Sequence, residues 1–206
     1  MSDIVQTAPR PKIIIATRNF HKTAEIRAMI GAAADVFDVL AFPELPEIEE
    51  TGRTFLENAR LKAIGISREI DGWVLADDSG LEVDVLDGAP GVISSSYGGI
   101  EGDHARNCFY LIEKMQGHSQ RSARFCCTMV LAKNGEEVAH FFGTVEGHLL
   151  DHMSGQGGFG YDPLFVPEGY SESFAELGDE VKNQLSHRAR ALAQVVIYLR
   201  SIGLLK

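Results

Sequence analysis

Short apolar runs alternate with stretches of helical periodicity through the first third of the chain. Residues 12–17 (KIIIAT) form an apolar run suited to a buried strand. Residues 19–31 place apolar side chains on one helical face and end at a glycine, which predicts a capped helix. A second strand is expected over residues 35–42 and a second helix over residues 54–70. The buried stripe of that helix comprises Phe55, Ala59, Ala63, Ile66 and Ile70.

The middle of the chain continues this pattern with shorter segments. Residues 73–77 (WVLAD) and 81–85 (LEVDV) predict two strands on either side of an Asp-Ser-Gly stretch. A glycine-rich loop over residues 88–99 follows. The next helix is expected over residues 103–117, with its aspartate as N-cap and its glycine as the end.

The last third predicts a long hairpin, a loop and a helix. Residues 122–133 and 136–147 are strand candidates joined at Asn134-Gly135, the pair that favours a type I′ turn. A loop spans residues 150–163, and the final helix runs from Ser186 to a stop at Gly203. The order βαβαββ, helix, hairpin, helix predicts an α/β fold with a mixed sheet.

Composition narrows the classes of protein to which the chain can belong. The 206 residues show neither an internal repeat nor a linker, so we expect one domain over residues 12–206. Residues 1–11 are polar and contain two prolines, which indicates a disordered tail. A net charge of −10 and a pI near 5.1 argue against broad nucleic-acid binding. No apolar run approaches the roughly 20 residues of a membrane span. The three cysteines lack metal-site spacing, which indicates reduced packing residues in a cytoplasmic protein.

The first candidate for chemistry is the turn over residues 16–22 (ATRNFHK), between a strand and a helix. Backbone amides at a helix start favour phosphate, and Lys22 adds a positive charge in the first turn. The stretch has neither the dinucleotide-binding nor the P-loop glycine pattern. A plain turn with Arg18 and Lys22 in water is the alternative, and it is favoured when this stretch is taken alone.

Two later segments also carry candidate chemistry. In residues 186–192 (SHRARAL), His187 and Arg188 occupy the first turn of a helix, where cations oppose the helix dipole. A bound anion or an acidic partner would resolve that conflict, and simple solvation is the alternative. In residues 157–163 (GGFGYDP), glycines allow close approach, and Phe159 or Tyr161 can stack on a flat ring. The alternative, an ordinary glycine-rich turn with inward aromatics, is favoured locally.

Two adjacent acids, Asp77 and Asp78, end the apolar run WVLA. If they continue the strand, their side chains point to opposite faces and cannot form one chelating pair. One would face a cleft, and Mg²⁺ usually takes one or two carboxylates together with waters and phosphates. The second carboxylate can come from Glu50, just before a helix. Two solvated turn acids remain the alternative.

Taken together, these stretches resemble the inosine triphosphate/xanthosine triphosphate pyrophosphatase family. The resemblance covers residues 12–192, and the motifs stand in the family's order. They are ATRNFHKTAEI, EETGRTFLENARLKA, LADDSGLEVDVLDGAPGV, ARF, GGFGYDPLF and KNQLSHRARAL.

The resemblance implies an elongated mixed β-sheet flanked by helices, two lobes around a substrate cleft, and a homodimer. It implies Mg²⁺-dependent hydrolysis of inosine, deoxyinosine and xanthosine triphosphates to monophosphate and pyrophosphate, which cleanses the nucleotide pool. Asp78 would be the general base and, with Glu50, a metal ligand; a metal role for Asp77 is left open. Substrate contacts would come from Thr17, Arg18, Asn19, Phe20, His21, Lys22, Lys62, Ser79, Phe159, Gly160, Tyr161, Asp162, Lys182, His187 and Arg188.

The sequence departs from the family pattern at three positions. His21 stands where the family often has glycine, Ser96 where it usually has arginine, and Met153 where it usually has proline. None of these removes a proposed catalytic group. A pyrimidine nucleotide pyrophosphatase and a non-catalytic nucleotide sensor are the rival interpretations, and the acids and lysines of the motifs speak against the sensor.

Overall fold

The computed structural model describes residues 10–205. The expected disordered tail over residues 1–11 falls almost entirely outside the described residues and stays a prediction. In chain order the strands and helices are β1 (Lys12–Ile15), α1 (Phe20–Ile30), β2 (Asp35–Asp38), α2 (Phe55–Glu69), β3 (Trp73–Val83), α3 (His104–Lys114), β4 (Ser122–Lys133), β5 (Glu136–Leu149), β6 (Phe165–Pro167), α4 (Phe174–Leu185) and α5 (His187–Ser201).

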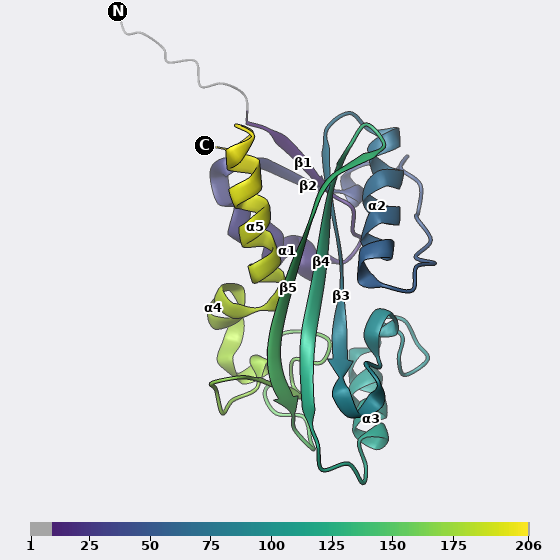
Figure 1. Cartoon of the computed structure of the whole chain (residues 1–206), viewed down its shortest axis with the longest axis vertical. Coiled ribbons are helices and arrows are strands. Elements are labelled where there is room, and N and C mark those ends of the chain that lie inside the picture. Colours follow the sequence, from purple (N-terminus) through teal and green to yellow (C-terminus); the bar gives the residue numbers. More distant parts are fainter. Residues whose placement is uncertain (1–9, 206) are drawn as a thin grey trace, which may run out of the picture.

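The strands form one six-stranded mixed sheet in the order β2-β1-β3-β4-β5-β6. β1 pairs in parallel with β2 and β3, whereas the remaining neighbours are antiparallel. The long strands β3, β4 and β5 run along most of the length of the molecule (Figure 1). The predicted α/β class and the mixed sheet with flanking helices are therefore confirmed, and the description as two lobes stays a prediction.

Helices pack on both faces of this sheet because successive strand residues point to opposite sides. Ile26 of α1 and Leu192 of α5 belong to a buried cluster with Ile13 and Ile15. Ala63 of α2 belongs to a second cluster, on the opposite face, which includes the intervening β1 residue, Ile14. A third cluster buries α3 and α4 against the other end of the long strands. No helix within residues 10–205 is long and apolar enough to cross a membrane.

β3 differs from the prediction because it runs unbroken through the Asp-Ser-Gly stretch. The strand pairs with β4 over its whole length except its first residue, and Gly80 lies opposite Cys126. The two predicted strands are therefore one. A Cβ atom at Gly80 would lie 2.3 Å from Ser94 Oγ and 2.6 Å from the Gly91 carbonyl oxygen. Close packing of residues 91–94 against the strand, not a turn, requires this glycine.

Other element boundaries also differ from the sequence pattern. The strand expected over residues 35–42 stops at Asp38, and the next three residues form a 3₁₀ turn. The helix expected to reach Gly117 ends at Lys114. α4 was not predicted, because Gly178 has non-helical backbone angles (φ 77°) and interrupts its periodicity. β6 was also missed, since three residues carry too short a pattern.

Turns and caps follow the sequence closely. Asn134 and Gly135 both have positive φ, 53° and 78°, as the predicted hairpin turn requires. The side chains of Thr54, Asp103 and Ser186 accept hydrogen bonds from the first turns of α2, α3 and α5. The predicted N-cap at Asp103 is therefore confirmed, and α2 and α5 are capped by the residues at which these helices are expected to begin.

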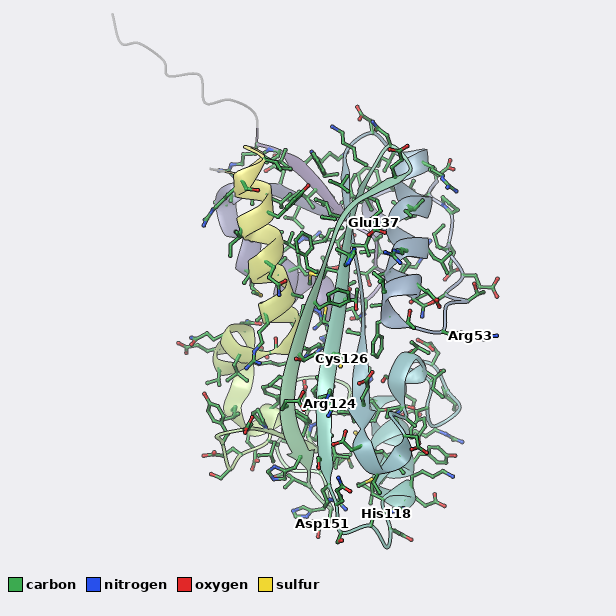
Figure 2. All side chains as sticks on the ribbon, viewed as in Figure 1. Arg53, His118, Arg124, Cys126, Glu137 and Asp151 are labelled. Atoms are coloured by element: carbon green, nitrogen blue, oxygen red, sulfur yellow. The ribbon has the colours of Figure 1, made fainter. Side chains whose placement is uncertain are left out.

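Cys126 and Cys127 lie on opposite faces of β4, as strand geometry predicts. Cys127 is buried in the cluster beneath α5, whereas Cys126 is half-buried. Figure 2 shows Cys126 and Arg124 on a stretch of β4 that no helix crosses in that view. All three cysteines are free, so the interpretation as reduced packing residues agrees with the structure.

Candidate active site

A large cleft opens beside the free edge of β3. β1 pairs with β3 only as far as Leu75, so the edge of β3 beyond that residue has no strand beside it. The cleft has a volume of about 1020 Å³. Its walls come from the turn before α1, the loop before α2, the loop over residues 92–96, the glycine-rich loop around Phe159, and the start of α5. This brings nearly all the motif segments together.

The turn before α1 contributes Thr17, Arg18 and Asn19 to the cleft wall, and the first turn of α1 adds Lys22. Asn19 caps the helix, and its side-chain oxygen accepts hydrogen bonds from the backbone N–H groups of His21 (3.0 Å) and Lys22 (3.3 Å). These two amides therefore already have a partner, and the Lys22 side chain is the main positive group of the turn. Phe20 is largely exposed, and neither it nor His21 is among the described residues that line the cleft.

Asp77 faces α1 and α5 and is completely buried. Its Oδ2 lies 3.1 Å from Lys22 Nζ and accepts a hydrogen bond from Arg188 Nε at 3.3 Å. Burial would raise the pKa of Asp77, but the charges of Lys22 and Arg188 outweigh it and hold the pKa well below its ordinary value. Asp77 is thus a fixed anion that positions two cations.

Asp78 faces α2 and lines the cleft. It accepts hydrogen bonds from Asn58 Nδ2 (3.1 Å) and Lys62 Nζ (3.4 Å). Burial raises the pKa of Asp78 by more than the Lys62 and Lys22 charges lower it. The two adjacent acids therefore have pKa shifts in opposite directions, a pattern found where carboxylates have different roles.

Glu50 and Asp78 lie on either side of one ammonium group. Lys62 Nζ is 2.6 Å from Glu50 Oε2 and 3.4 Å from Asp78 Oδ1. The pKa of Lys62 is raised even though burial lowers it, because both acids favour its charged form. Among residues 10–205 no group of three or more His, Cys, Asp or Glu side chains is arranged to hold a metal. Two carboxylates at the cleft nevertheless suit Mg²⁺, which fills its remaining positions with water and phosphate oxygens.

The loop around Phe159 separates its two aromatic residues. Tyr161 is buried and donates a hydrogen bond to the Ser94 carbonyl oxygen at 2.9 Å, so it holds the loop against the core. Phe159 is half-buried and lines the cleft. Asp162 accepts a hydrogen bond from the Phe159 amide at 2.7 Å and pairs with Lys182 at 2.6 Å. Burial raises the pKa of Asp162 by more than Lys182 lowers it.

The start of α5 places two further motif residues at the cleft. Arg188 is almost completely buried and is bound by Asp77, Glu25 and Ser79. An acidic partner, one of the options that the sequence left open, thus balances this cation at the helix start. His187 stacks on Phe125 (ring centroids 4.9 Å apart). Burial holds the pKa of His187 well below its ordinary value, and its Nδ1 atom has no partner within the described residues.

Glu25 is a functional candidate that the sequence did not single out. Its carboxylate lies 3.1 Å from Lys182 Nζ and also binds Arg188. It therefore joins two cations of the cleft, and through Arg188 it connects to Asp77. The sequence feature that could have identified Glu25 is its position one helical turn after Lys22, on the same face of α1. Asn58, one helical turn before Lys62 on α2, is a second such residue, and it binds Asp78.

A model of the Ham1 family matches residues 13–198, and this span contains every cleft residue described above. The chain belongs to the Ham1 family. A dITP/XTP pyrophosphatase of Listeria monocytogenes serotype 4b (strain F2365) is 45% identical over 187 residues, which cover 89% of this chain and 92% of the relative.

Solved structures of similar proteins have the same fold. The Ham1 protein of Staphylococcus aureus matches with a TM-score of 0.84 and 34% identity, covering 93% of this chain and 99% of that one. A nucleoside-triphosphatase / dITP/XTP pyrophosphatase of Mycobacterium abscessus matches with a TM-score of 0.74 and 38% identity, covering 90% and 98%. The family resemblance expected from the motifs is thus confirmed over nearly the whole chain.

Proposed function

We propose that this Ham1 family member hydrolyses deaminated purine nucleoside triphosphates to the monophosphate and pyrophosphate. The substrates are inosine, deoxyinosine and xanthosine triphosphates, in line with the names of its relatives. The observation that carries the proposal is the acid pair at the cleft. Asp78 faces the cleft with a raised pKa, while Asp77 anchors Lys22 and Arg188 beneath it.

Local positive charge suits this cleft to a triphosphate although the chain carries a net charge of −10. Lys22 and Lys62 line the same cavity on either side of β3 and face its acids. Arg18, largely exposed, adds a third cation at the wall. A polyphosphate can bind these ammonium groups while the carboxylates stay beside them, so no buried charge loses its partner when the substrate binds.

Glu50 and Asp78 are the residues that would hold Mg²⁺. When bound, the ion would supply charge neutralisation and polarise a phosphoryl oxygen. Asp78 takes the proton from the water that attacks the α-phosphorus, and its raised pKa favours that role. Asn58 holds the carboxylate in place through its 3.1 Å hydrogen bond. Pyrophosphate leaves as the water oxygen bonds to phosphorus.

The base side of the cleft explains how deaminated purines can be selected. Phe159 offers a stacking surface, and Arg188 offers N–H donors that suit the C6 keto oxygen of hypoxanthine and xanthine. Asp77, Glu25 and Ser79 hold the guanidinium in one orientation. The C6 amine of adenine, which is itself a donor, would then face a fixed donor and form no hydrogen bond with it. Sites built on hydrogen bonds can discriminate by about 10⁴-fold, because the wrong group leaves a buried partner unpaired.

Pyrophosphate release from a panel of nucleoside triphosphates tests this function. The panel comprises inosine, xanthosine, guanosine, adenosine and thymidine triphosphates, each with Mg²⁺ and with a chelator. The expected result is release from inosine and xanthosine triphosphates only, abolished by the chelator and lowered about 10²–10⁴-fold by Asp78→Asn. A preference for the pyrimidine nucleotide would point to a pyrimidine pyrophosphatase. No release from any nucleotide would favour a non-catalytic sensor.

We further propose that one domain over residues 12–206 carries out this reaction as a homodimer in the cytoplasm, where it clears deaminated nucleotides from the pool. The three free cysteines suit a reducing compartment. Light scattering of the purified chain measures its oligomeric state, and a mass of one chain would overturn the dimer.

A further inference from the structure

His21 stacks on Phe159 although the two residues lie far apart in the sequence. Their ring centroids are 5.1 Å apart, and the planes differ by only 15°. His21 is the second residue of α1, whereas Phe159 lies in the loop before β6. Phe159 lines the cleft, and His21 is not among the described residues that do so. The His21 imidazole therefore reaches the cleft wall through its contact with Phe159.

The loop itself supplies little to fix this phenyl ring. Gly158 and Gly160 flank Phe159, and both have positive φ values of 71° and 64°. Such a segment has few conformational restraints of its own. The backbone is held by the hydrogen bond from the Phe159 amide to Asp162, but that bond does not set the direction of the ring. Orientation must come from what touches the ring.

Cations of the cleft contact the same ring. Lys182 Nζ lies 4.2 Å from the centroid of Phe159, and the guanidinium carbon of Arg188 lies 5.7 Å from it. Both cations are held by acids, Lys182 by Glu25 and Asp162. Phe159 thus contacts the stacked imidazole of His21, the ring of His104 (centroids 6.0 Å apart) and two cations that acids hold in place.

We propose that His21 is a positioning residue that holds Phe159 in the orientation in which it stacks on the purine base. This rests on the proposed function. The role differs from the direct substrate contact that the motif resemblance implies for His21, because the His21 ring is stacked on Phe159. His21 therefore contributes to base binding and leaves the step at phosphorus unchanged.

The test compares His21→Gly and His21→Ala with His21→Phe, which restores an aromatic ring. The first two variants are expected to raise KM for inosine triphosphate by about 3- to 10-fold, the typical value of an aromatic pair. The kcat stays within about twofold, since the reacting groups are untouched. His21→Phe returns KM to within about twofold of the wild type. The His21→Ala variant avoids the helix cost of glycine.

Two controls separate base stacking from phosphate binding. Tripolyphosphate, which has no base, is expected to inhibit the wild type and His21→Ala equally. In a Phe159→Leu background, His21→Ala is expected to add no further increase in KM, because its effect passes through that ring. Three results would each overturn the proposal. They are an unchanged KM in His21→Ala, a weakening of tripolyphosphate inhibition in His21→Ala as large as its rise in KM, and a KM in His21→Phe that stays as high as in His21→Ala.

The two proposals fail differently. If the wild type hydrolyses inosine triphosphate but the His21 variants keep its KM, the role of His21 is wrong and the proposed function stands. If the wild type hydrolyses no nucleotide, the proposed function is wrong. Calorimetric titration of the same variants with inosine triphosphate then tests the role of His21, since the expected loss of affinity needs no turnover.

Discussion

Asp77 and Asp78 are neighbours on β3, yet their carboxylates lie on opposite faces of the sheet and bind different lysines. Lys22 contacts Asp77 at 3.1 Å, and Lys62 contacts Asp78 at 3.4 Å. Lys22 and Arg188 hold the pKa of Asp77 down against the effect of burial, whereas burial raises the pKa of Asp78. Strand alternation thus gives two identical side chains different surroundings.

Separate amide substitutions of these acids are expected to give different defects. Asp78→Asn removes the proposed base and lowers kcat for inosine triphosphate by about 10²–10⁴-fold, with little change in stability. Asp77→Asn leaves the buried Arg188 with only Glu25 as a charged partner, so the free energy of unfolding falls by about 3 kcal/mol. Steady-state kinetics and urea unfolding measure the two effects.

Glu82→Gln is the matched control on the same strand. Glu82 is half-buried, and its contact with Arg124 is a loose 3.9 Å ion pair away from the cleft. The Glu82→Gln variant is expected to keep the kcat and the free energy of unfolding of the wild type. Equal losses of kcat and stability in Asp77→Asn and Asp78→Asn would contradict the asymmetry.

Glu25→Gln is expected to reduce the stability that the protein gains as pH rises above the acid range. Burial would raise the pKa of Glu25, but Arg188 and Lys182 lower it below its ordinary value of 4.5. A group whose pKa is depressed in the folded state stabilises it above the unfolded-state pKa, and this stabilisation disappears as pH falls through the folded-state pKa. The difference in unfolding free energy between wild type and Glu25→Gln is therefore larger at pH 7 than at pH 3.

Urea unfolding at a series of pH values measures this difference. Glu172→Gln makes the same charge change at an exposed position and is expected to give a small difference at every pH. A wild-type pH dependence in Glu25→Gln would show that the carboxylate does not stabilise Lys182 and Arg188.

Local chemistry allowed much of this fold to be predicted. Asn19, Thr54, Asp103 and Ser186 act on the amides of the next few residues, so a cap can be recognised from the neighbouring sequence. The separation of Asp77 from Asp78 also follows from one local rule, the alternation of side chains along a strand. In both cases the physical cause lies within a few residues of its effect.

The remaining features depend on contacts between distant parts of the chain. Glu25 binds Arg188, which lies 163 residues later in the chain. The helical periodicity of α1 shows which face carries Glu25 but does not predict that Arg188 is its partner. The Asp-Ser-Gly stretch has the composition of a turn, but packing of residues 91–94 on Gly80 makes it a strand. Sequence patterns suggested which residues react, and that remains a prediction, while the network of contacts around them needed the tertiary structure.

The cysteines are expected to react slowly with alkylating agents in the folded protein. Burial raises the pKa of Cys108 and Cys126 to about 12, and it raises that of Cys127 as well. The reactive thiolate is therefore scarce near neutral pH. Labelling by iodoacetamide at pH 7.5 is predicted to be at least about a hundredfold slower than that of free cysteine. All three react in urea, and fast labelling of native Cys126 would contradict this.

Gly80→Ala tests whether close packing on β3 shapes the cleft. The added methyl group would meet Ser94 Oγ and the Gly91 backbone, so the loop over residues 91–94, which lines the cleft, must move. We expect a loss of about 1–3 kcal/mol in unfolding free energy together with a clear fall in kcat/KM for inosine triphosphate. Gly88→Ala is the matched control. It has open space for a methyl group but a φ of +84°, so it costs stability without changing kcat/KM. Wild-type kinetics in Gly80→Ala would show that the cleft does not depend on this contact.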